Sequence, residues 1–462
     1  MSALPPQPLS PLDGRYRAAT GNLGDFLSEA GLNRARVHVE VEWIAYITAN
    51  SLFGASPLEP AQLQELRDWA AAFGQQEIER LAEIEATTQH DVKAVEYLVR
   101  AQLERQKLSH LAELTHICCT SEDINNLSYA LTVKQAIAEV WRPKFVAVID
   151  ELARQARKYA DLPMLSRTHG QPATPTTLGK ELAVFVHRLR RQLRQLDAVE
   201  YLGKFSGATG TFAAHLSAAP EADWRKIGRE FVENSLGLSF NPLTTQIESH
   251  DWQAELYDRV VHSNRILHNL ATDIWSYISI GYFRQIPVAG ATGSSTMPHK
   301  VNPIRFENAE ANFELSNAIL GSLAETLVTS RWQRDLTDSS AQRNIGVGLG
   351  HSALALDNVL KGLGQIDAAP EVLAADLDTN WEVLGEAIQT VIRAEVTAGR
   401  SDISDPYAAL KELTRGRRIG QEELREFVSG LNIGQEAKDR LLALTPATYT
   451  GLAAELVDLL DN

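Results

Sequence analysis

Cysteine is nearly absent from this chain of 462 residues. The two cysteines that occur are adjacent, Cys118 and Cys119. Neighbouring thiols cannot build a disulfide framework, so the chain belongs to a reducing compartment. Two interpretations of the pair stay open: two small apolar residues on a buried turn, or a redox pair.

Positive charge and long hydrophobic runs are scarce as well. The 44 Lys and Arg residues face 59 Asp and Glu residues, a formal net charge of −15. Sequence-independent binding of nucleic acid, or of an anionic membrane surface, needs the opposite balance. No charge-free apolar run reaches the roughly 18 residues of a membrane span, and the first residues, MSALPPQP, lack a basic start and an apolar signal core. We therefore expect a cytoplasmic protein without membrane or nucleic-acid partners.

Apolar residues spaced three and four apart dominate the chain, whereas strand-like alternation is hard to find. Between Leu178 and Val199 the apolar positions recur about every 3.5 residues, the repeat of helices packed with a left-handed supercoil. Similar patterns predict long helices over 124–160, 256–277, 307–330 and 346–364. Pro143 lies inside the first of these and lacks a backbone donor, so we expect it to kink or split that helix.

The spacing predicts an all-α fold: an elongated central bundle of about five long helices, flanked by two smaller helical domains. The predicted boundaries are 1–111, 112–364 and 365–462. Helical patterns over 32–50 and 60–85 belong to the first domain, and short amphipathic helices around 409–445 belong to the last.

Four segments between the helices are crowded with residues that carry chemistry. The richest is AGATGSSTMPHKVNP at 289–303, where glycines allow tight backbone turns, Ser294 and Ser295 present hydroxyls, and Lys300 adds positive charge. A flexible surface loop is the alternative to an anion site. SRTHGQPATPT at 166–176 presents His169 near Arg167 and Gln171, although a histidine taken singly is more often structural.

The other two segments have simple structural interpretations beside the functional ones. TSED at 120–123 fits a helix N-cap with an acidic first turn. The segment 331–343 offers three guanidinium groups suited to phosphate or carboxylate, and a surface ion-pair cluster is its alternative. The HExxH, paired CxxC and GxxxxGK[ST] motifs do not occur, so zinc and ATP hydrolysis have no support. The glycines of GVGLG at 346–350 follow no predicted strand and indicate close helix packing.

Together these segments resemble the fumarase/aspartase superfamily, whose hallmark loop GSSxMPxKxNP is matched by GSSTMPHKVNP at 293–303. Within the superfamily the chain resembles the bacterial adenylosuccinate lyase family, from Ser10 to the C-terminus. The matching motifs are SPLDGRY at 10–16, TTQHDVKAVEY at 87–97, CTSEDINN at 119–126, SRTHGQP at 166–172 and RWQRDLTD at 331–338. Two positions depart from the family pattern: Gln89 stands where Asn is expected, and Cys118 where Gly or Ala is more usual.

The resemblance implies a homotetrameric lyase that needs no metal or cofactor and acts on a small-molecule nucleotide. It would eliminate fumarate from adenylosuccinate, giving AMP, and from succinylaminoimidazole carboxamide ribotide, giving AICAR. By family analogy Ser294 is the base and His169 the acid. A serine hydroxyl is a poor base in water, and Lys300 with the glycine-rich backbone is the expected source of the positive potential that activates it.

The same analogy assigns the substrate-binding residues. Those at the succinyl end are Thr120, Ser121, Gln246, Ser295, Lys300 and Asn302. The phosphate would be held by Arg15, Tyr16, Arg334, Ser339 and Arg343. His90, Asp91 and Asn308 would line the space between, and Gln89, Val301 and Ser340 complete the predicted set.

Two rival classes remain open at this point. A lyase acting on argininosuccinate, aspartate or malate would share the loop but need no phosphate site, so Arg15, Tyr16 and the cluster from Arg334 to Arg343 argue against it. A catalytically silent structural protein could lose His169 or Ser294 without penalty, and both are present.

Helix length suggests that each active site draws on more than one chain. A helix over 176–202 would span about 40 Å at 1.5 Å per residue. If consecutive helices run antiparallel, Thr120 and His169 lie at opposite ends of the bundle, too far apart for one nucleotide. A second bundle packed antiparallel would bring one chain's Thr120 beside another's His169, and the resemblance implies shared sites in a tetramer.

Overall fold

The structure is a computed structural model that describes residues 8–287, 297, 300–414 and 419–461. Internal contacts divide the chain into two compact units. Unit 1 comprises Met1–Val146, Gln192–Arg265 and Ala309–Asp357; unit 2 comprises Ala147–Arg191, Ile266–Asn308 and Asn358–Asn462. The domain boundaries expected near residues 112 and 365 stay a prediction.

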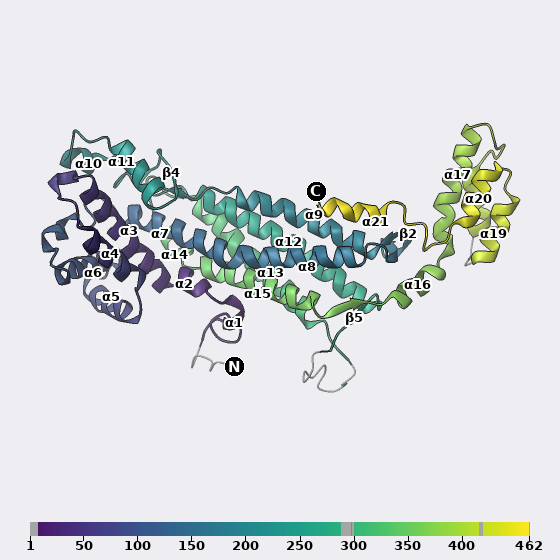
Figure 1. Cartoon of the computed structure of the whole chain (residues 1–462), viewed down its shortest axis with the longest axis horizontal. Helices are drawn as coiled ribbons and strands as arrows, with labels where there is room; N and C mark the ends of the chain where they lie inside the picture. The colour runs from purple at the N-terminus through teal and green to yellow at the C-terminus, as the bar shows by residue number, and fades with distance from the viewer. Residues whose placement is uncertain (1–7, 288–296, 298–299, 415–418, 462) are drawn as a thin grey trace. The chain divides into compact units, whose positions relative to one another are not determined.

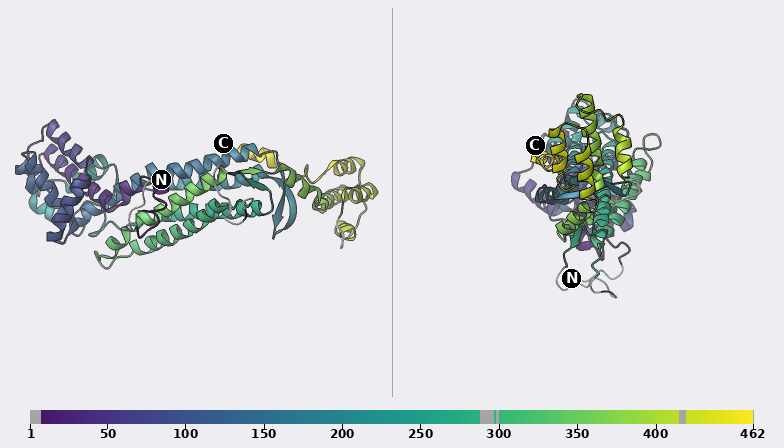
Figure 2. Two further views of the ribbon diagram at one scale, coloured as in Figure 1. Left: turned by 90° about the horizontal axis from the view of Figure 1, so that it is seen from below. Right: turned by 90° about the vertical axis from the view of Figure 1, so that its right-hand side faces the viewer.

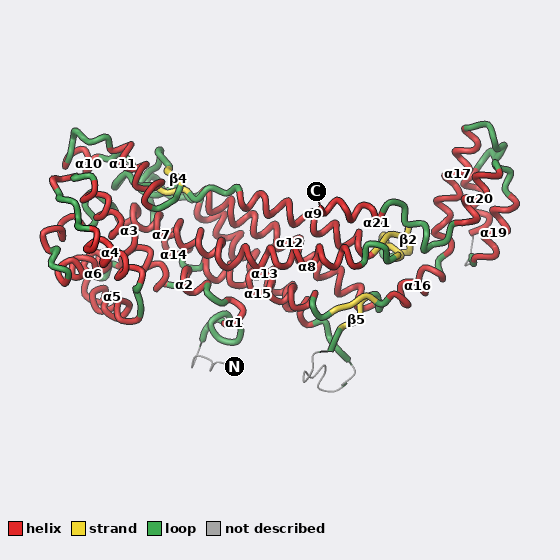
Figure 3. Tube along the Cα trace, viewed as in Figure 1, coloured by secondary structure: helices red, strands yellow, loops and turns green. Residues whose placement is uncertain are grey.

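Long helices account for most of the described chain, which confirms the all-α prediction (Figures 1 and 3). The expected helices are α7 (Ser121–Ala136), α8 (Arg142–Lys158), α9 (Leu178–Asp197), α12 (Asp251–Ser279), α13 (Ile304–Leu327) and α15 (Ile345–Leu363). All but α7 contribute residues to both units. None of the helices in the described part of the chain combines the length and apolarity of a membrane span.

The predicted break at Pro143 is confirmed. Between α7 and α8 lies a π-helical turn, η3 (Ile137–Trp141), whose wider winding lets the Arg142 N–H donate to the Ile137 carbonyl five residues earlier. Pro143 follows at once and has no N–H to give to the α-helical pattern. The helix therefore changes its hydrogen-bond register at the proline, as π-bulges typically do.

Unit 1 holds an N-terminal helical core formed by α3 to α6 (Figure 1). Residues such as Val41, Leu66, Leu98 and Leu103 are buried there at the interface of these helices. Gly74 precedes α5 and breaks the pattern expected over 60–85 into two helices. The N-terminal elements are α1 (Arg17–Thr20), α2 (Leu23–Leu27), α3 (Glu29–Ala49), η1 (Leu52–Gly54), α4 (Pro60–Ala71), α5 (Gln75–Thr88), α6 (Asp91–Arg105) and η2 (Ser109–Leu114).

The remaining elements of unit 1 are short. A parallel pair of two-residue strands joins β3 to β4, with Leu202 beside Ser239. The glycines of 346–350 pack closely, as predicted: a Cβ on Gly348 would lie 2.7 Å from the Leu320 side chain. The elements are β3 (Leu202–Gly203), α10 (Ala213–Ala218), α11 (Trp224–Glu230), η4 (Phe231–Ser235), β4 (Ser239–Phe240) and α14 (Thr337–Gln342).

Unit 2 contains strands that the sequence did not predict. β1 (Pro163–Thr168) and β2 (Gln171–Thr177) form an antiparallel hairpin with an irregularity between Met164 and Ser166. β5 (Phe283–Gln285) pairs with β6 (Ile366–Ala368), also antiparallel. Figure 3 shows these strands as short yellow segments among helices.

The C-terminal helices of unit 2 form their own core around Trp381, Ile388, Leu424 and Leu441. In Figure 2 these yellow-green helices stay packed together in both views. The short helices expected at 409–445 are confirmed as α18, α19 and α20. The elements are α16 (Pro370–Asp378), η5 (Trp381–Leu384), α17 (Gly385–Thr397), α18 (Pro406–Thr414), α19 (Gln421–Gly430), α20 (Gln435–Ala443), α21 (Ala453–Leu456) and η6 (Val457–Asp461).

Candidate active site

A cavity of about 450 Å³ in unit 1 brings together many of the predicted site residues. Its walls come from the junction of α5 and α6, the first turns of α7, and α14 with the residues before it. The predicted residues that line it are Gln89, His90, Asp91, Ser121, Arg334, Ser339, Ser340 and Arg343. Two guanidinium groups, those of Arg334 and Arg343, and the serine hydroxyls line the same cavity, so it suits an anion.

The junction of α5 and α6 is a sharp turn made by Gln89. Its φ is +49°, in the left-handed region that ends many helices, and its N–H donates to the Glu85 carbonyl. His90 then caps α6 by accepting the Lys93 N–H at its Nδ1, at 3.2 Å. The turn thus sets His90 and Asp91 side by side at the edge of the cavity.

Asp91 is held by two guanidinium groups. Arg36, a fully buried residue of α3, lies 2.8 Å from its Oδ2, and Arg343 lies 3.1 Å from the same oxygen. Burial favours the neutral form of Asp91, but the two arginines and the Val92 N–H outweigh it and keep the pKa of this carboxyl below its usual value. Asp91 is therefore a fixed negative charge near neutral pH.

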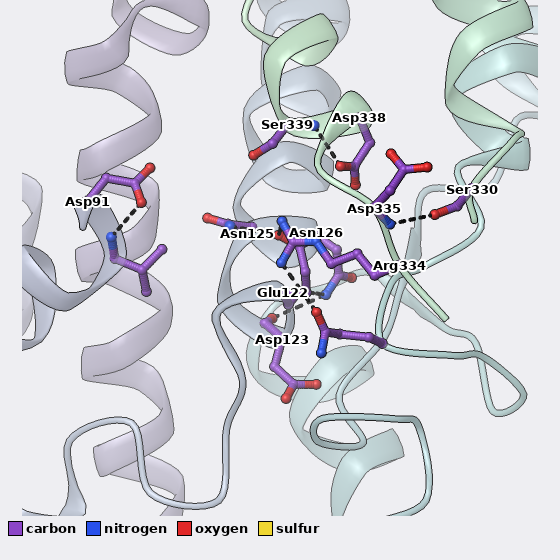
Figure 4. A network of polar contacts seen from close by, with 12 residues as sticks. Asp91, Glu122, Asp123, Asn125, Asn126, Ser330, Arg334, Asp335, Asp338 and Ser339 are labelled. Atoms are coloured by element: carbon purple, nitrogen blue, oxygen red, sulfur yellow. Dashed lines mark hydrogen bonds and ion pairs between the residues drawn. The ribbon is translucent and has the colours of Figure 1, made fainter. Parts of the chain in front are cut away.

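The start of α7 carries a second set of charges (Figure 4). The Thr120 N–H donates to the Asp123 carboxylate at 2.8 Å, which confirms the N-cap interpretation of this segment. Ser121 lines the cavity, whereas Thr120 does not. Glu122 lies 3.0 Å from Arg334; burial raises the pKa of Glu122, and Arg334 opposes that rise.

Arg334 also links the cavity to Gln246, a predicted residue that does not line it. Arg334 Nη1 donates to Gln246 Oε1 at 3.3 Å, and Gln246 Nε2 donates to the Ala208 carbonyl at 2.9 Å. The hydrogen bonds with Arg334 and with the Ala208 carbonyl thus fix the orientation of the Gln246 amide.

The segment that holds Arg15 and Tyr16 approaches Arg343 from another side. Ser10 and Asp13 share a smaller cavity of about 140 Å³ with Arg343. The Arg15 guanidinium lies 5.8 Å from the centre of the Tyr16 ring. Arg15 and Tyr16 themselves line neither cavity.

His169 lies in unit 2, at the tip of the β1–β2 hairpin. The two residues of the turn, His169 and Gly170, have φ values of +53° and +74°. Positive φ at both positions is the signature of the tight turn that matches strand twist, where Asn-Gly is usual. A histidine there is strained, and its ring is displayed on an exposed tip.

The serines of the hallmark loop, Ser294 and Ser295, lie outside the described residues. Of the residues that follow, Lys300 and Val301 are exposed and Asn302 is partly buried. The Val301 carbonyl accepts a hydrogen bond from Gln285 Nε2, and Asn308, on α13, accepts one from Asn358 Nδ2 at 2.9 Å. The described residues of this paragraph, Gln285 and Asn358 included, all belong to unit 2.

The two departures from the family pattern share a backbone feature. Gln89 and Cys118 both have positive φ, +49° and +63°, where Asn and Gly are the favoured residues. Burial raises the pKa of both cysteine thiols, so the reactive thiolate is disfavoured. Both side chains are partly buried, so both interpretations of the pair stay open.

Several residues of the site were missed by sequence reasoning, namely Glu29, Glu85, Arg36 and Asn125. Glu29 pairs with Arg343, Arg36 donates to Asn125 at 2.9 Å, and Glu85 and Asn125 line the cavity. One signal was available for Arg36: RVHVEVEW at 36–43 alternates charged or polar residues with apolar ones inside a predicted helix, so some of its charges must lie at core positions. Charges at core positions of a helix require partners.

Another cavity of unit 1, of about 490 Å³, contains none of the predicted residues. It lies among α2, α3, α4 and α7, with Phe26, Arg34, His38 and Leu131 in its walls. It is slightly larger than the cavity of about 450 Å³, but the residues predicted from the motifs line that other cavity.

Comparison with known proteins matches the chain to two consecutive families. Residues 14–315 match the lyase family, and residues 330–450 match the adenylosuccinate lyase C-terminal family. Over 452 residues the chain is 48% identical to the adenylosuccinate lyases of Vibrio cholerae and Escherichia coli, covering 97% of this chain and 98% of each relative. The enzyme of the same name from Legionella pneumophila is 49% identical over 451 residues, 97% of each chain.

Solved structures share the fold at lower identity. A fumarate lyase from Mesorhizobium sp. BNC1 superposes with a TM-score of 0.74 at 20% identity, covering 95% of this chain and 96% of that one. A 3-carboxy-cis,cis-muconate lactonizing enzyme from Pseudomonas putida gives 0.72 at 21% identity, covering 95% of each.

Replacing Asp91 tests the charge balance of the cavity. Asp91→Asn leaves the buried Arg36 without its carboxylate and should lower the free energy of unfolding by about 1–3 kcal/mol at pH 7. Because the folded-state pKa of Asp91 is depressed, this stabilisation is present above about pH 4 and disappears as the pH falls through the folded pKa. Urea unfolding of both proteins at several pH values measures the difference.

The exposed pair of Arg80 and Glu83 supplies the control. Glu83→Gln should cost no more than about 1 kcal/mol at any of these pH values. A difference between wild type and Asp91→Asn that is equally large at pH 3 and pH 7 would contradict the assigned role of the Asp91 charge.

Proposed function

The chain belongs to the adenylosuccinate lyase family, and we propose that the cavity of unit 1 and the loops of unit 2 supply the residues of that reaction. The protein is a fumarate-releasing lyase of purine nucleotide biosynthesis. It eliminates fumarate from adenylosuccinate to give AMP, and from succinylaminoimidazole carboxamide ribotide to give AICAR.

The reaction needs a base, an acid and a stabiliser of negative charge. A proton next to a succinyl carboxylate is removed, the carbon–nitrogen bond breaks, and the departing nitrogen takes up a proton. Ser294 acts as the base and His169 as the acid. Lys300 and the glycine-rich loop stabilise the negative charge that builds up on the carboxylate before the bond breaks. The exposed hairpin tip supports the role of His169, since an acid must reach its substrate.

The phosphate is bound in the cavity of unit 1. The observation that carries this assignment is the convergence of Arg334, Arg343, Ser339 and Ser340 on one cavity. Guanidinium groups bind phosphate through paired charge-assisted hydrogen bonds, and serine hydroxyls at a helix start add further donors. Both arginines already pair with carboxylates, so the phosphate replaces part of an existing contact.

The residues proposed for the succinyl end and for the space between the ends are distributed over both units along the chain. Thr120, Ser121 and Gln246 belong to unit 1, as do Gln89, His90 and Asp91. Lys300, Val301, Asn302 and Asn308 belong to unit 2, and Ser295 lies outside the described residues. Arg15 and Tyr16 complete the phosphate end.

Active sites are shared between chains of a homotetramer. Helix length supports this sharing, because the uninterrupted run of α7, η3 and α8 from Ser121 to Lys158 separates Thr120 from His169 along the chain. Neighbouring chains then complete one another's sites. A cytoplasmic location, with no cofactor, accompanies this proposal.

Ser294→Ala tests the base and, through the wild-type assay, the function itself. Purified wild-type protein should release fumarate from adenylosuccinate. The variant should lose about 10²- to 10⁴-fold in kcat, since proton removal is lost, while its affinity for substrate stays nearly unchanged because many other groups hold the ligand. Fumarate absorbance and titration calorimetry measure the two properties.

Ser217→Ala, in α10, is the matched control and should retain full activity, because its hydroxyl donates only to the Ala213 carbonyl of its own helix. If Ser294→Ala keeps a large share of its turnover, Ser294 is not the base, and Ser295 or His169 becomes the first alternative.

Arg343→Ala and Arg334→Ala test the phosphate site. Each should weaken binding of the phosphorylated substrate by about 1.5–3 kcal/mol, roughly 10- to 150-fold in Kd, with little change for the dephosphorylated nucleoside. Arg154→Ala removes an exposed arginine paired with Glu151 and should change neither affinity. Equal losses for both compounds would show that Arg334 and Arg343 support the fold and do not bind phosphate.

Mixing inactive variants tests the shared site. Ser294→Ala and His169→Ala proteins, dissociated mildly and reassembled together, should recover part of the activity, since some mixed sites receive both intact residues from different chains. Mass spectrometry verifies the hybrid tetramers. If hybrids stay inactive, the two residues serve a site from the same chain, and a Thr120 variant mixed with the His169 variant then decides whether any sharing occurs.

A further inference from the structure

The hairpin that carries His169 depends on its surroundings for its position. A two-stranded hairpin is marginally stable by itself, and the strained turn at His169 and Gly170 weakens it further. β1 packs against α16, and β2 packs against η5 and α21. Contacts from these elements must therefore fix where the imidazole lies.

The carboxylate of Asp376, on α16, accepts several hydrogen bonds near the tip of the hairpin. Its Oδ2 accepts from Arg167 Nη2 at 2.5 Å and from the hydroxyl of Tyr282. Its Oδ1 accepts from Asn380 Nδ2 at 3.3 Å. Tyr282 is fully buried beside β5, so the carboxylate is tied to a rigid part of unit 2.

Arg167 transmits this restraint to the turn. It pairs with Pro172 across the hairpin and stands two residues before His169. In a hairpin with a two-residue turn, the pair that flanks the turn, here Thr168 with Gln171, is hydrogen-bonded and the next pair is not. The side-chain contact of Arg167 with Asp376 therefore adds a restraint at a position where the ladder supplies none.

The second strand has a separate anchor farther from the tip. Thr174 Oγ1 donates to Glu386 Oε2 at 2.5 Å, and the Tyr449 hydroxyl donates to the same oxygen at 3.4 Å. With one anchor on each strand, the hairpin is restrained both in its tilt and in its rotation, and the anchor nearer to the tip has the greater effect on the imidazole.

We propose that Asp376 is a positioning residue for His169, which it holds in place through Arg167. The inference rests on the proposed role of His169 as the acid. Asp376 binds no substrate; its carboxylate fixes Arg167 and, with Tyr282 and Asn380, sets the direction in which the hairpin tip presents the imidazole. Misplacing a catalytic group by about 1 Å can cost 10²-fold in rate.

Asp376→Asn is the principal test. It keeps the size of the side chain but removes the charge that orients Arg167. We expect kcat to fall about 10- to 100-fold, with KM within about two-fold of wild type, because proton delivery suffers and binding does not. Hydrogen–deuterium exchange of the peptide over 163–177 should become faster in the intact tetramer.

Asp367 provides a closely matched control in the same unit. Its carboxylate also accepts from a cation and a tyrosine hydroxyl, Lys158 at 2.7 Å and Tyr159 at 2.5 Å, but neither partner belongs to the hairpin. Asp367→Asn should keep wild-type kcat and wild-type exchange over 163–177.

A conservative variant and a double variant distinguish a positioning role of Asp376 from general support of the fold. Asp376→Glu keeps the charge and should recover most of kcat, and Arg167→Ala combined with Asp376→Asn should be no slower than the slower single variant. If Asp376→Asn fails to fold, Arg167→Lys and Tyr282→Phe carry the same test, with smaller losses of kcat at unchanged KM.

The possible failures are distinguishable. If His169→Ala stays active, the proposed acid is wrong. If His169→Ala is inactive while Asp376→Asn keeps wild-type kcat, the positioning role is wrong. The positioning role of Asp376 would also be wrong if Asp367→Asn lowered kcat by the same factor. It would be wrong as well if Asp376→Glu did not restore kcat.

Discussion

A buried guanidinium cannot remain without partners, and the cavity of unit 1 is organised around one. Arg36 is almost completely inaccessible, and its nitrogen atoms contact Asp91 at the start of α6, Asn125 in the first turns of α7, and Asn33 on its own helix. Leaving such a cation unpaired in the protein interior would cost several kcal/mol. The relative positions of α6 and α7 are therefore restricted to those that satisfy Arg36, and these two helix starts form two of the cavity walls.

Asp123 imposes the same kind of restriction on the other side of α7. Its carboxylate is fully buried, lies 2.8 Å from Lys204, and accepts the N–H groups of Thr120, Ser206 and Gly207. An acidic residue in the first turn of a helix is often only a cap. Here the cap also joins α7 to a segment about 80 residues later in the chain. Local capping and long-range positioning are performed by one side chain, which is why the two interpretations of TSED are compatible.

The sequence was informative where structure depends on neighbours in the chain. Apolar spacing predicted the long helices, and Pro143 predicted the break between α7 and α8, because both effects act within a few residues. The hairpin was missed because SRTHGQPATPT has no apolar alternation; its strands exist through Arg167, Thr174 and their partners on α16 and α17. Pairs such as Arg36 with Asp91 are equally invisible to spacing. The predicted site residues came from resemblance to a family, and the structure gathers eight of them in one cavity, while Ser294 and Ser295 lie outside the described residues.

With the phosphate bound as proposed, the pairing of the site arginines would explain how a protein with a net charge of −15 binds a multiply anionic substrate. Arg334 contacts Glu122, and Arg343 contacts Glu29 and Asp91. A phosphate that enters the cavity therefore exchanges partners with carboxylates and does not meet an isolated cation. Of these carboxylates, Glu29 is exposed and can be rehydrated at little cost, whereas Asp91 is also held by Arg36. Glu29 is thus the partner that Arg343 gives up most readily. Binding then depends on local exchange of hydrogen bonds more than on long-range attraction, which the surrounding negative charge would oppose.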